Sequence, residues 1–144
     1  RIDSMRLLTF CENDTVNNIL SIYTNKALSV NIPIKARANA RKELMASATD
    51  LVTIMGNMLE NSIHGAQNSE VSKPTISVSV YHKDGKFVIN CKNSCKKDLD
   101  FDEIPDTLSS IGIKSIYKTA EKYNGSCRFS AHGCVFEALI IMDA

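Results

Sequence analysis

Hydrophobic residues recur along the chain with two different periods, and each period predicts one type of element. A period near 3.6 residues predicts helices, and strict alternation predicts half-buried strands. The helical pattern covers about residues 14–27, 50–67 and 112–123, and the alternating pattern covers residues 30–38, 76–80, 87–91, 127–131 and 135–141. Strands outnumber helices, and two pairs of strands adjoin as hairpins. This order favours an α/β (α+β) fold, a mixed sheet with its helices layered on one face.

Individual residues predict where several of these elements begin and end. Thr49 or Asp50 is expected to cap the longest helix, because both side chains can accept from free backbone amides. Pro33 moves its strand toward an edge of the sheet, since proline cannot donate to a neighbouring strand. The Asp-Gly pair at 84–85 predicts a tight hairpin. Gly125 is expected to supply the left-handed residue that ends the last helix.

Composition narrows the class of protein. The 144 residues are 44% hydrophobic and 23% charged, which suits one globular domain. The formal net charge of +1 gives no sign of a nucleic-acid partner, and no apolar run is long enough to span a membrane. The five cysteines are odd in number and irregularly spaced, so they predict neither a disulfide framework nor a zinc site.

The longest predicted helix carries the most informative polar residues. Asn57, Asn61 and His64 fall within about 60° of one another at 100° per residue, opposite the apolar face. Further polar residues lie close by on the helical projection: Asp50, Thr53 and Glu60. Asparagine has a low helix propensity in the middle of a helix, so two asparagines one turn apart indicate a functional role. The alternative is an ordinary solvated helix face.

Three segments resemble the gyrase, chaperone and histidine-kinase ATPase superfamily (GHKL). Residues 57–66, NMLENSIHGA, resemble its N box, and residues 111–125 resemble its second glycine box with the helix that follows. Residues 11–20 are similar to the segment that opens the ATPase domain of peptide-sensing histidine kinases of the quorum-sensing accessory-regulator type. The resemblance covers residues 11–142, and the three segments occur in the family's order.

The resemblance implies a fold, two cofactors and a reaction. The fold is a two-layer sandwich of a mixed sheet under three helices, with ATP held between helices and a flexible lid at about residues 95–110. Asn61 takes the position that coordinates Mg²⁺, a hard cation that needs few protein ligands. Asn57 takes the position where gyrases carry a hydrolytic Glu. Because an amide is no general base, Asn57 favours phosphoryl transfer to a histidine over ATP hydrolysis.

Other nucleotide-binding positions follow from the same resemblance. His64 replaces a Lys or Arg that touches phosphate, or it is a plain surface histidine. Asn93 ends the strand where relatives read adenine, although Lys92 replaces the expected acid. Asn93 either accepts from the adenine amino group or simply caps the turn. Of the glycines of the second glycine box, only Gly112 is present. Gly112 could equally be the ordinary start of a helix. The remaining residues assigned to the nucleotide near this box are Ser109, Ser110 and Lys114.

The partners implied are ATP, a histidine-bearing dimerisation hairpin of the same full-length protein, and a response regulator. The chain starts at Arg1, so residues 1–12 are expected to be a linker remnant before an ATP-binding domain at 13–144. The full-length protein would be a membrane-anchored bacterial protein, and this chain would be its cytoplasmic catalytic domain. The domain is expected to contact neither membrane nor nucleic acid and to be inactive alone. His82 and His132 are interpreted as structural or incidental.

Two other functions compete with this one. A degenerate regulatory module that no longer binds nucleotide would explain Lys92 and the missing glycines. A GHKL serine kinase that binds a regulator is the other, and the segment at 11–20 argues against it.

Overall fold

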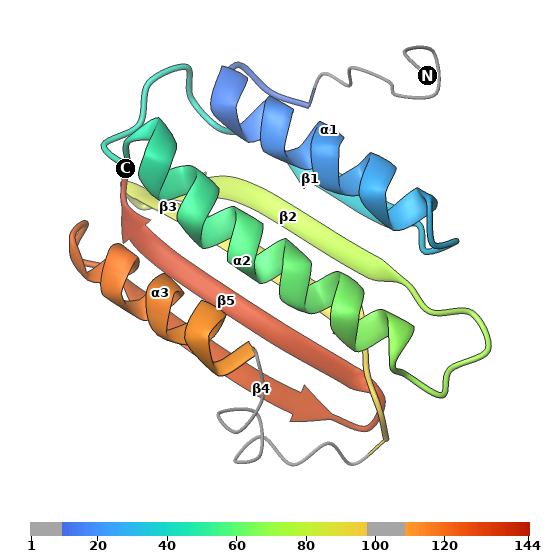
Figure 1. Ribbon diagram of the computed structural model, residues 1–144. Coiled ribbons are helices and arrows are strands. Elements are labelled where there is room, and N and C mark those ends of the chain that lie inside the picture. The colour runs from blue at the N-terminus through green and yellow to red at the C-terminus, as the bar shows by residue number, and fades with distance from the viewer. Residues whose placement is uncertain (1–9, 98–108) are drawn as a thin grey trace.

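The described part of the chain folds into two layers, a five-stranded sheet and three helices that cover one of its faces (Figure 1). The computed structural model describes residues 10–97 and 109–144, except for the side chains of residues 109–111. The elements, in chain order, are α1 (Asp14–Leu28), β1 (Ile34–Ala38), α2 (Ala48–Gln67), β2 (Ile76–Lys83), β3 (Lys86–Ser94), α3 (Ser109–Glu121), β4 (Ser126–His132) and β5 (Val135–Asp143). The predicted α/β architecture is confirmed.

The sheet is mixed, with strand order β1-β2-β3-β5-β4. β1 pairs with β2 in parallel, and every other pairing is antiparallel. Pro33 immediately precedes the edge strand β1, as its missing N–H requires. The predicted strand at 30–38 starts too early, because Asn31 is left-handed and Ile32 donates to the carbonyl of Ala27 to close helix α1.

Helix α2 runs through the middle of the helical layer and packs on the core (Figure 1). Its N-cap is Ser47, whose Oγ accepts from the Asp50 amide at 3.1 Å, so the expected cap at Thr49 or Asp50 is wrong. Burial also differs between neighbouring apolar residues of this helix. Val52 is 52% exposed, whereas Ile54 is fully buried.

Helix α3 begins at Ser109 rather than at Gly112, so Gly112 lies inside the first turn. At its other end the left-handed residue is Asn124, not Gly125. Gly125 is needed for space instead, because a Cβ there would lie 2.7 Å from the Ala120 carbonyl oxygen. Strand β3 continues to Ser94, three residues beyond the alternating pattern at 87–91 that predicted it.

Turn residues behave as the sequence indicates in both hairpins. Asp84 and Gly85 both have positive φ between β2 and β3, the conformation of a type I′ turn. Gly133 has a φ of 59° in the turn between β4 and β5. No helix within the described ranges is long and apolar enough to cross a membrane.

Candidate functional site

The candidate site begins on the flank of α2 that faces α3. Asn57 and Asn61 lie one turn apart on this flank, and both are half-buried. The Asn57 Nδ2 donates to the Thr53 carbonyl oxygen at 2.7 Å. One of the two N–H groups of this amide is therefore used within the helix, and Oδ1 remains an acceptor that can meet a ligand. We call Asn57, Asn61 and His64 the amide flank.

Gly112 brings the first turn of α3 against this flank. A Cβ at position 112 would lie 3.3 Å from Asn57 Oδ1, so the bare backbone of α3 touches the Asn57 side chain. The first amides of a helix lack partners within the helix, and the helix dipole makes that end favourable for anions. The structure thus brings Asn57 together with the N-terminal turn that contains Ser109 and Ser110.

Asn93 lies at the far end of the amide flank, near the end of β3. Its side chain is 4% exposed, and its Nδ2 donates to the Ser94 carbonyl oxygen at 2.8 Å. A Cβ on Gly65 would lie 2.7 Å from that Nδ2, closer than two such atoms approach. Glycine at position 65 therefore lets the last turns of α2 rest directly on the Asn93 amide. The motif at residues 57–66 includes Gly65, but the pattern of polar and apolar residues along this helix does not predict a contact with Asn93.

Lys92 points to the opposite face of the sheet from Asn93. Cys91 contacts Ser62 of α2 with its sulfur 3.0 Å from the hydroxyl, so odd-numbered residues of β3 face the helices. Lys92 is exposed and pairs in register with Ser77 and Glu137, away from α2. The basic residue therefore does not replace an acid inside the site, because the position that faces the helices is Asn93.

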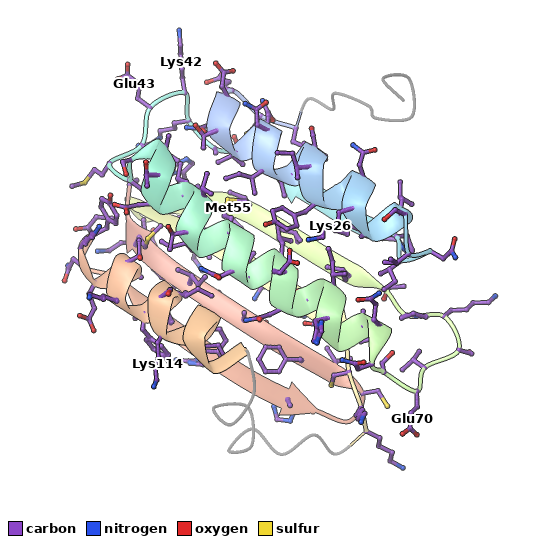
Figure 2. All side chains as sticks on the ribbon, in the orientation of Figure 1. Lys26, Lys42, Glu43, Met55, Glu70 and Lys114 are labelled. Atoms are coloured by element: carbon purple, nitrogen blue, oxygen red, sulfur yellow. The ribbon has the colours of Figure 1, made fainter. Side chains whose placement is uncertain are left out.

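The two remaining predicted residues are both exposed. His64 lies in the last turns of α2, three residues after Asn61 on the same flank. Lys114 lies on the side of α3 turned away from α2, two residues after Gly112 (Figure 2). The structure groups His64 with the asparagines and leaves Lys114 outside the group. The side chains of Ser109 and Ser110 lie outside the described residues.

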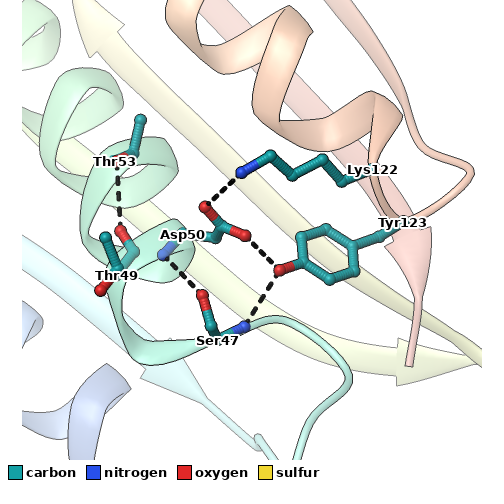
Figure 3. A network of polar contacts seen from close by, with 6 residues as sticks. All are labelled: Ser47, Thr49, Asp50, Thr53, Lys122 and Tyr123. Carbon is teal, nitrogen blue, oxygen red and sulfur yellow. Dashed lines mark hydrogen bonds and ion pairs between the residues drawn. The ribbon is translucent and has the colours of Figure 1, made fainter.

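Asp50 and Glu60, which the helical projection placed near the asparagines, have structural partners. Asp50 accepts from Lys122 Nζ at 3.1 Å and from the Tyr123 hydroxyl, and that hydroxyl accepts from the Ser47 amide at 3.1 Å (Figure 3). These donors hold the pKa of Asp50 below its ordinary value, the Tyr123 hydroxyl first and Lys122 second. Glu60 pairs with Lys26 of α1 at 2.6 Å.

The histidines on the sheet have no place near the amide flank. His82 accepts from the Arg41 amide at 3.0 Å through Nε2 and packs its ring 5.5 Å from that of Phe87. Burial, and secondarily the nearby Arg41, lower the pKa of His82. His132 is exposed at the end of the edge strand β4. The described ranges contain no cluster of three or more His, Cys, Asp or Glu side chains suited to a metal ion.

A family model and solved structures match this chain. The family described as "GHKL domain" matches residues 46–143. The catalytic domain of histidine kinase ThkA in a nucleotide-free form superposes with a TM-score of 0.72 at 12% identity, covering 90% of each chain. A search of the curated proteins finds no match.

Two longer structures are also similar. Acinetobacter baumannii histidine kinase AdeS has a TM-score of 0.69 at 9% identity over 90% of this chain and 62% of its own. The histidine kinase domain of the Erythrobacter litoralis EL346 blue-light activated histidine kinase has a TM-score of 0.71 at 12% identity, over 89% and 63%. The present chain therefore spans less than two thirds of these two structures. At such identities the likeness shows the fold.

Proposed function

Because this chain belongs to the GHKL domain family, we propose that it is the ATP-binding catalytic domain of a sensor histidine kinase. The observation that carries the proposal is the placement of two asparagine amides beside the first turn of α3. Asn57 touches the bare backbone of Gly112, and Asn61 follows one turn later on the same flank. Neutral amides and free backbone N–H groups suit a polyphosphate, which also needs a cation.

The adenine end of the nucleotide is proposed to lie near Asn93. Its amide is fixed by the hydrogen bond to Ser94 and by the close approach of Gly65, so its oxygen is held in one orientation. An amide oxygen can accept from an exocyclic amino group, which is the chemistry that distinguishes adenine from guanine at that edge. Burial of Asn93 strengthens such a hydrogen bond, because water competes less well in a low dielectric.

The phosphate end is proposed to lie between the amide flank and α3. The donor set fits Mg²⁺, since Asn61 offers a hard neutral oxygen and the Asn57 oxygen is turned away from its own helix bond to Thr53. When bound, Mg²⁺ would be held by Asn61 and would neutralise part of the phosphate charge. His64 would add a hydrogen bond or a positive charge to the same phosphates.

The reaction we propose is phosphoryl transfer, with this chain positioning the nucleotide. Asn57 carries no carboxylate that would activate water, so the domain holds the γ-phosphate for a nucleophile from elsewhere. That nucleophile would be a histidine on a dimerisation hairpin of the full-length protein, and a response regulator would accept the phosphoryl group next. The same proposal makes residues 1–12 a remnant of the linker to the dimerisation hairpin. It also makes the full-length protein a membrane-anchored kinase that responds to a quorum-sensing signal.

Calorimetric titration of ATP with and without Mg²⁺ tests the proposal, in the wild type and in Asn61→Ala. We expect Mg²⁺-dependent binding to be lost in Asn61→Ala with the fold intact, because the side chain lies away from the apolar face. Asn18→Ala, the same substitution at an exposed position of α1, is the matched control. Equal Mg²⁺-ATP affinity in the wild type and Asn61→Ala would contradict the metal assignment.

A regulatory module that no longer binds nucleotide is the second candidate. It is favoured by the lost glycines at the start of α3, where Leu108 to Ile111 stand in place of the usual glycine pattern. The orientation of Lys92 removes the other argument for it. No measurable ATP binding by the wild type in the same titration would establish this second function.

A further inference from the structure

Two of the five cysteines face each other across neighbouring strands. The antiparallel register of β3 and β5 ends at the pair Ser94 and Val135, and one further step places Cys95 opposite Cys134. The Cys95 amide donates to the Cys134 carbonyl oxygen at 2.8 Å, so the pairing continues through this step. Cys134 is the turn residue just before β5, and directly opposed residues of antiparallel strands have Cα atoms about 4.5–5.5 Å apart, within the range that disulfides span.

Both side chains belong to the side of the sheet that faces the helices. Cys95 continues the row of Cys91 and Asn93 in β3, and Cys134 precedes Phe136, which pairs with Asn93. Cys95 is 2% exposed, whereas Cys134 is half-buried. Burial, and secondarily the neighbouring Cys134, raise the pKa of the Cys95 thiol.

The other three cysteines lack such a partner. Cys91 is enclosed between β3 and α2 against the Ser62 hydroxyl, and burial raises its pKa to about 12. Cys127 stands opposite Ile140, and burial raises its pKa to about 11. Cys11 lies before α1 with its sulfur near the Asn13 carbonyl oxygen. Only Cys95 and Cys134 are opposed in register.

We propose that Cys95 and Cys134 are a redox-sensitive pair that forms a reversible disulfide when the chain meets hydrogen peroxide. The more accessible Cys134 thiolate attacks one peroxide oxygen, the O–O bond breaks and hydroxide leaves, which gives a sulfenic acid. The Cys95 thiolate then attacks that sulfur and displaces hydroxide. Two thiols and one peroxide yield one disulfide and two waters, with two electrons passing from sulfur to oxygen.

The disulfide would tie β3 to β5 two residues after Asn93. It would be a covalent bond at the end of the strand that carries the proposed adenine contact, and it needs no distant movement because the backbone pairing already exists. The modification depends on the cysteines alone and stands apart from whether the domain binds ATP.

Peptide mapping of the full chain after peroxide treatment tests this inference. The reduced wild type is exposed to graded hydrogen peroxide, remaining thiols are alkylated, and the digest is analysed by mass spectrometry. We expect a linked peptide pair containing Cys95 and Cys134, lighter by two hydrogen atoms than the two thiol peptides and separated by dithiothreitol. Cys127→Ser should still form it, whereas Cys134→Ser should leave Cys95 free to be alkylated after unfolding.

Oxidation of Cys134 to sulfinic or sulfonic acid without a link to Cys95 would overturn the proposal. A dimer joined through Cys134, or a link between any other two cysteines, would overturn it equally. Because the decisive measurement is made on the wild type, a variant that fails to fold does not obscure the result.

Discussion

Helices α2 and α3 contact each other in contrasting ways at their two ends. At one end Asp50 of α2 is held by Lys122 and Tyr123 after α3, and Tyr123 also accepts from the Ser47 amide (Figure 3). At the other end the backbone of Gly112 rests against the Asn57 side chain. The first end satisfies its polar groups internally, and we call it the anchored end.

The second end, which we call the open end, leaves polar groups for a ligand. Asn57 uses one of its two side-chain N–H groups within α2, and no side chain at position 112 intrudes between the two helices. A network of charged hydrogen bonds rigidifies the elements that it joins. The comparison teaches that the anchored end fixes the position of α3, while the open end keeps the amide flank available. Substitutions at the two ends should therefore affect different measurements.

The largest effect is expected at the open end, from Gly65→Ala. The added methyl would approach Asn93 Nδ2 to 2.7 Å and must displace that amide. ATP affinity in the titration should fall at least tenfold, or about 1.4 kcal/mol. Stability should change little, because alanine favours a helix by about 1 kcal/mol over glycine and offsets part of the strain.

Gly112→Ala is the matched control for that substitution. Here the new methyl would lie 3.3 Å from Asn57 Oδ1, a tight contact with a side chain that can shift slightly. ATP affinity should fall less than in Gly65→Ala. A larger loss in Gly112→Ala would mean that the phosphate side of the flank, rather than Asn93, limits affinity.

A smaller effect, on stability alone, is expected at the anchored end from Tyr123→Phe. The hydroxyl donates to Asp50 and accepts from the Ser47 amide, and both contacts are lost while the ring remains. Chemical denaturation should show a loss of about 1 kcal/mol, a usual net value for such hydrogen bonds at a partly exposed site. The ATP affinity of the folded variant should match the wild type, and a parallel loss of affinity would show that the two ends are coupled.

The sequence predicted the elements better than it predicted the details of the two ends. Periodicity is set by burial along each element, so α2 and its polar flank were found from spacing alone. Ser47, Thr49 and Asp50 can each cap a helix, and tertiary contacts with Tyr123 select among them. Such contacts join residues far apart in the chain, which no local pattern encodes.

The sequence predicted which residues belong to the candidate site, but it did not predict which way their side chains face. Asn93 and Lys92 are neighbours, and which of them faces the helices depends on how far β3 continues in register. The alternating apolar pattern ends at residue 91, yet β3 is extended by pairing with β5 as far as Ser94. The close approaches of Gly65 and Gly112 likewise depend on distances between elements, which sequence spacing does not give.

A weaker effect should appear in the pH dependence of stability at the anchored end. The hydrogen bonds from Tyr123 and Lys122 lower the pKa of Asp50 in the folded state below its unfolded value of about 3.9. The stabilisation is therefore complete above that unfolded value and is lost as the pH falls through the folded pKa. Thermal melts from pH 6 to pH 3 should show a shallower acid loss in Asp50→Asn than in the wild type. Glu12→Gln, at an exposed position, should keep the wild-type slope.

The smallest effect is expected from Lys92→Asp, which should leave ATP affinity within about twofold of the wild type, or less than about 0.5 kcal/mol. The side chain is exposed on the face of the sheet opposite α2, in register with Ser77 and Glu137, so a carboxylate there cannot reach a nucleotide beside Asn93. Charges on an exposed face are also screened by salt. The same titration, run beside Asn93→Ala, separates the two neighbours: Asn93→Ala should weaken binding, and Lys92→Asp should not. Tighter binding in Lys92→Asp would mean that this position does face the adenine, and the strand end would then have to turn over in the bound state.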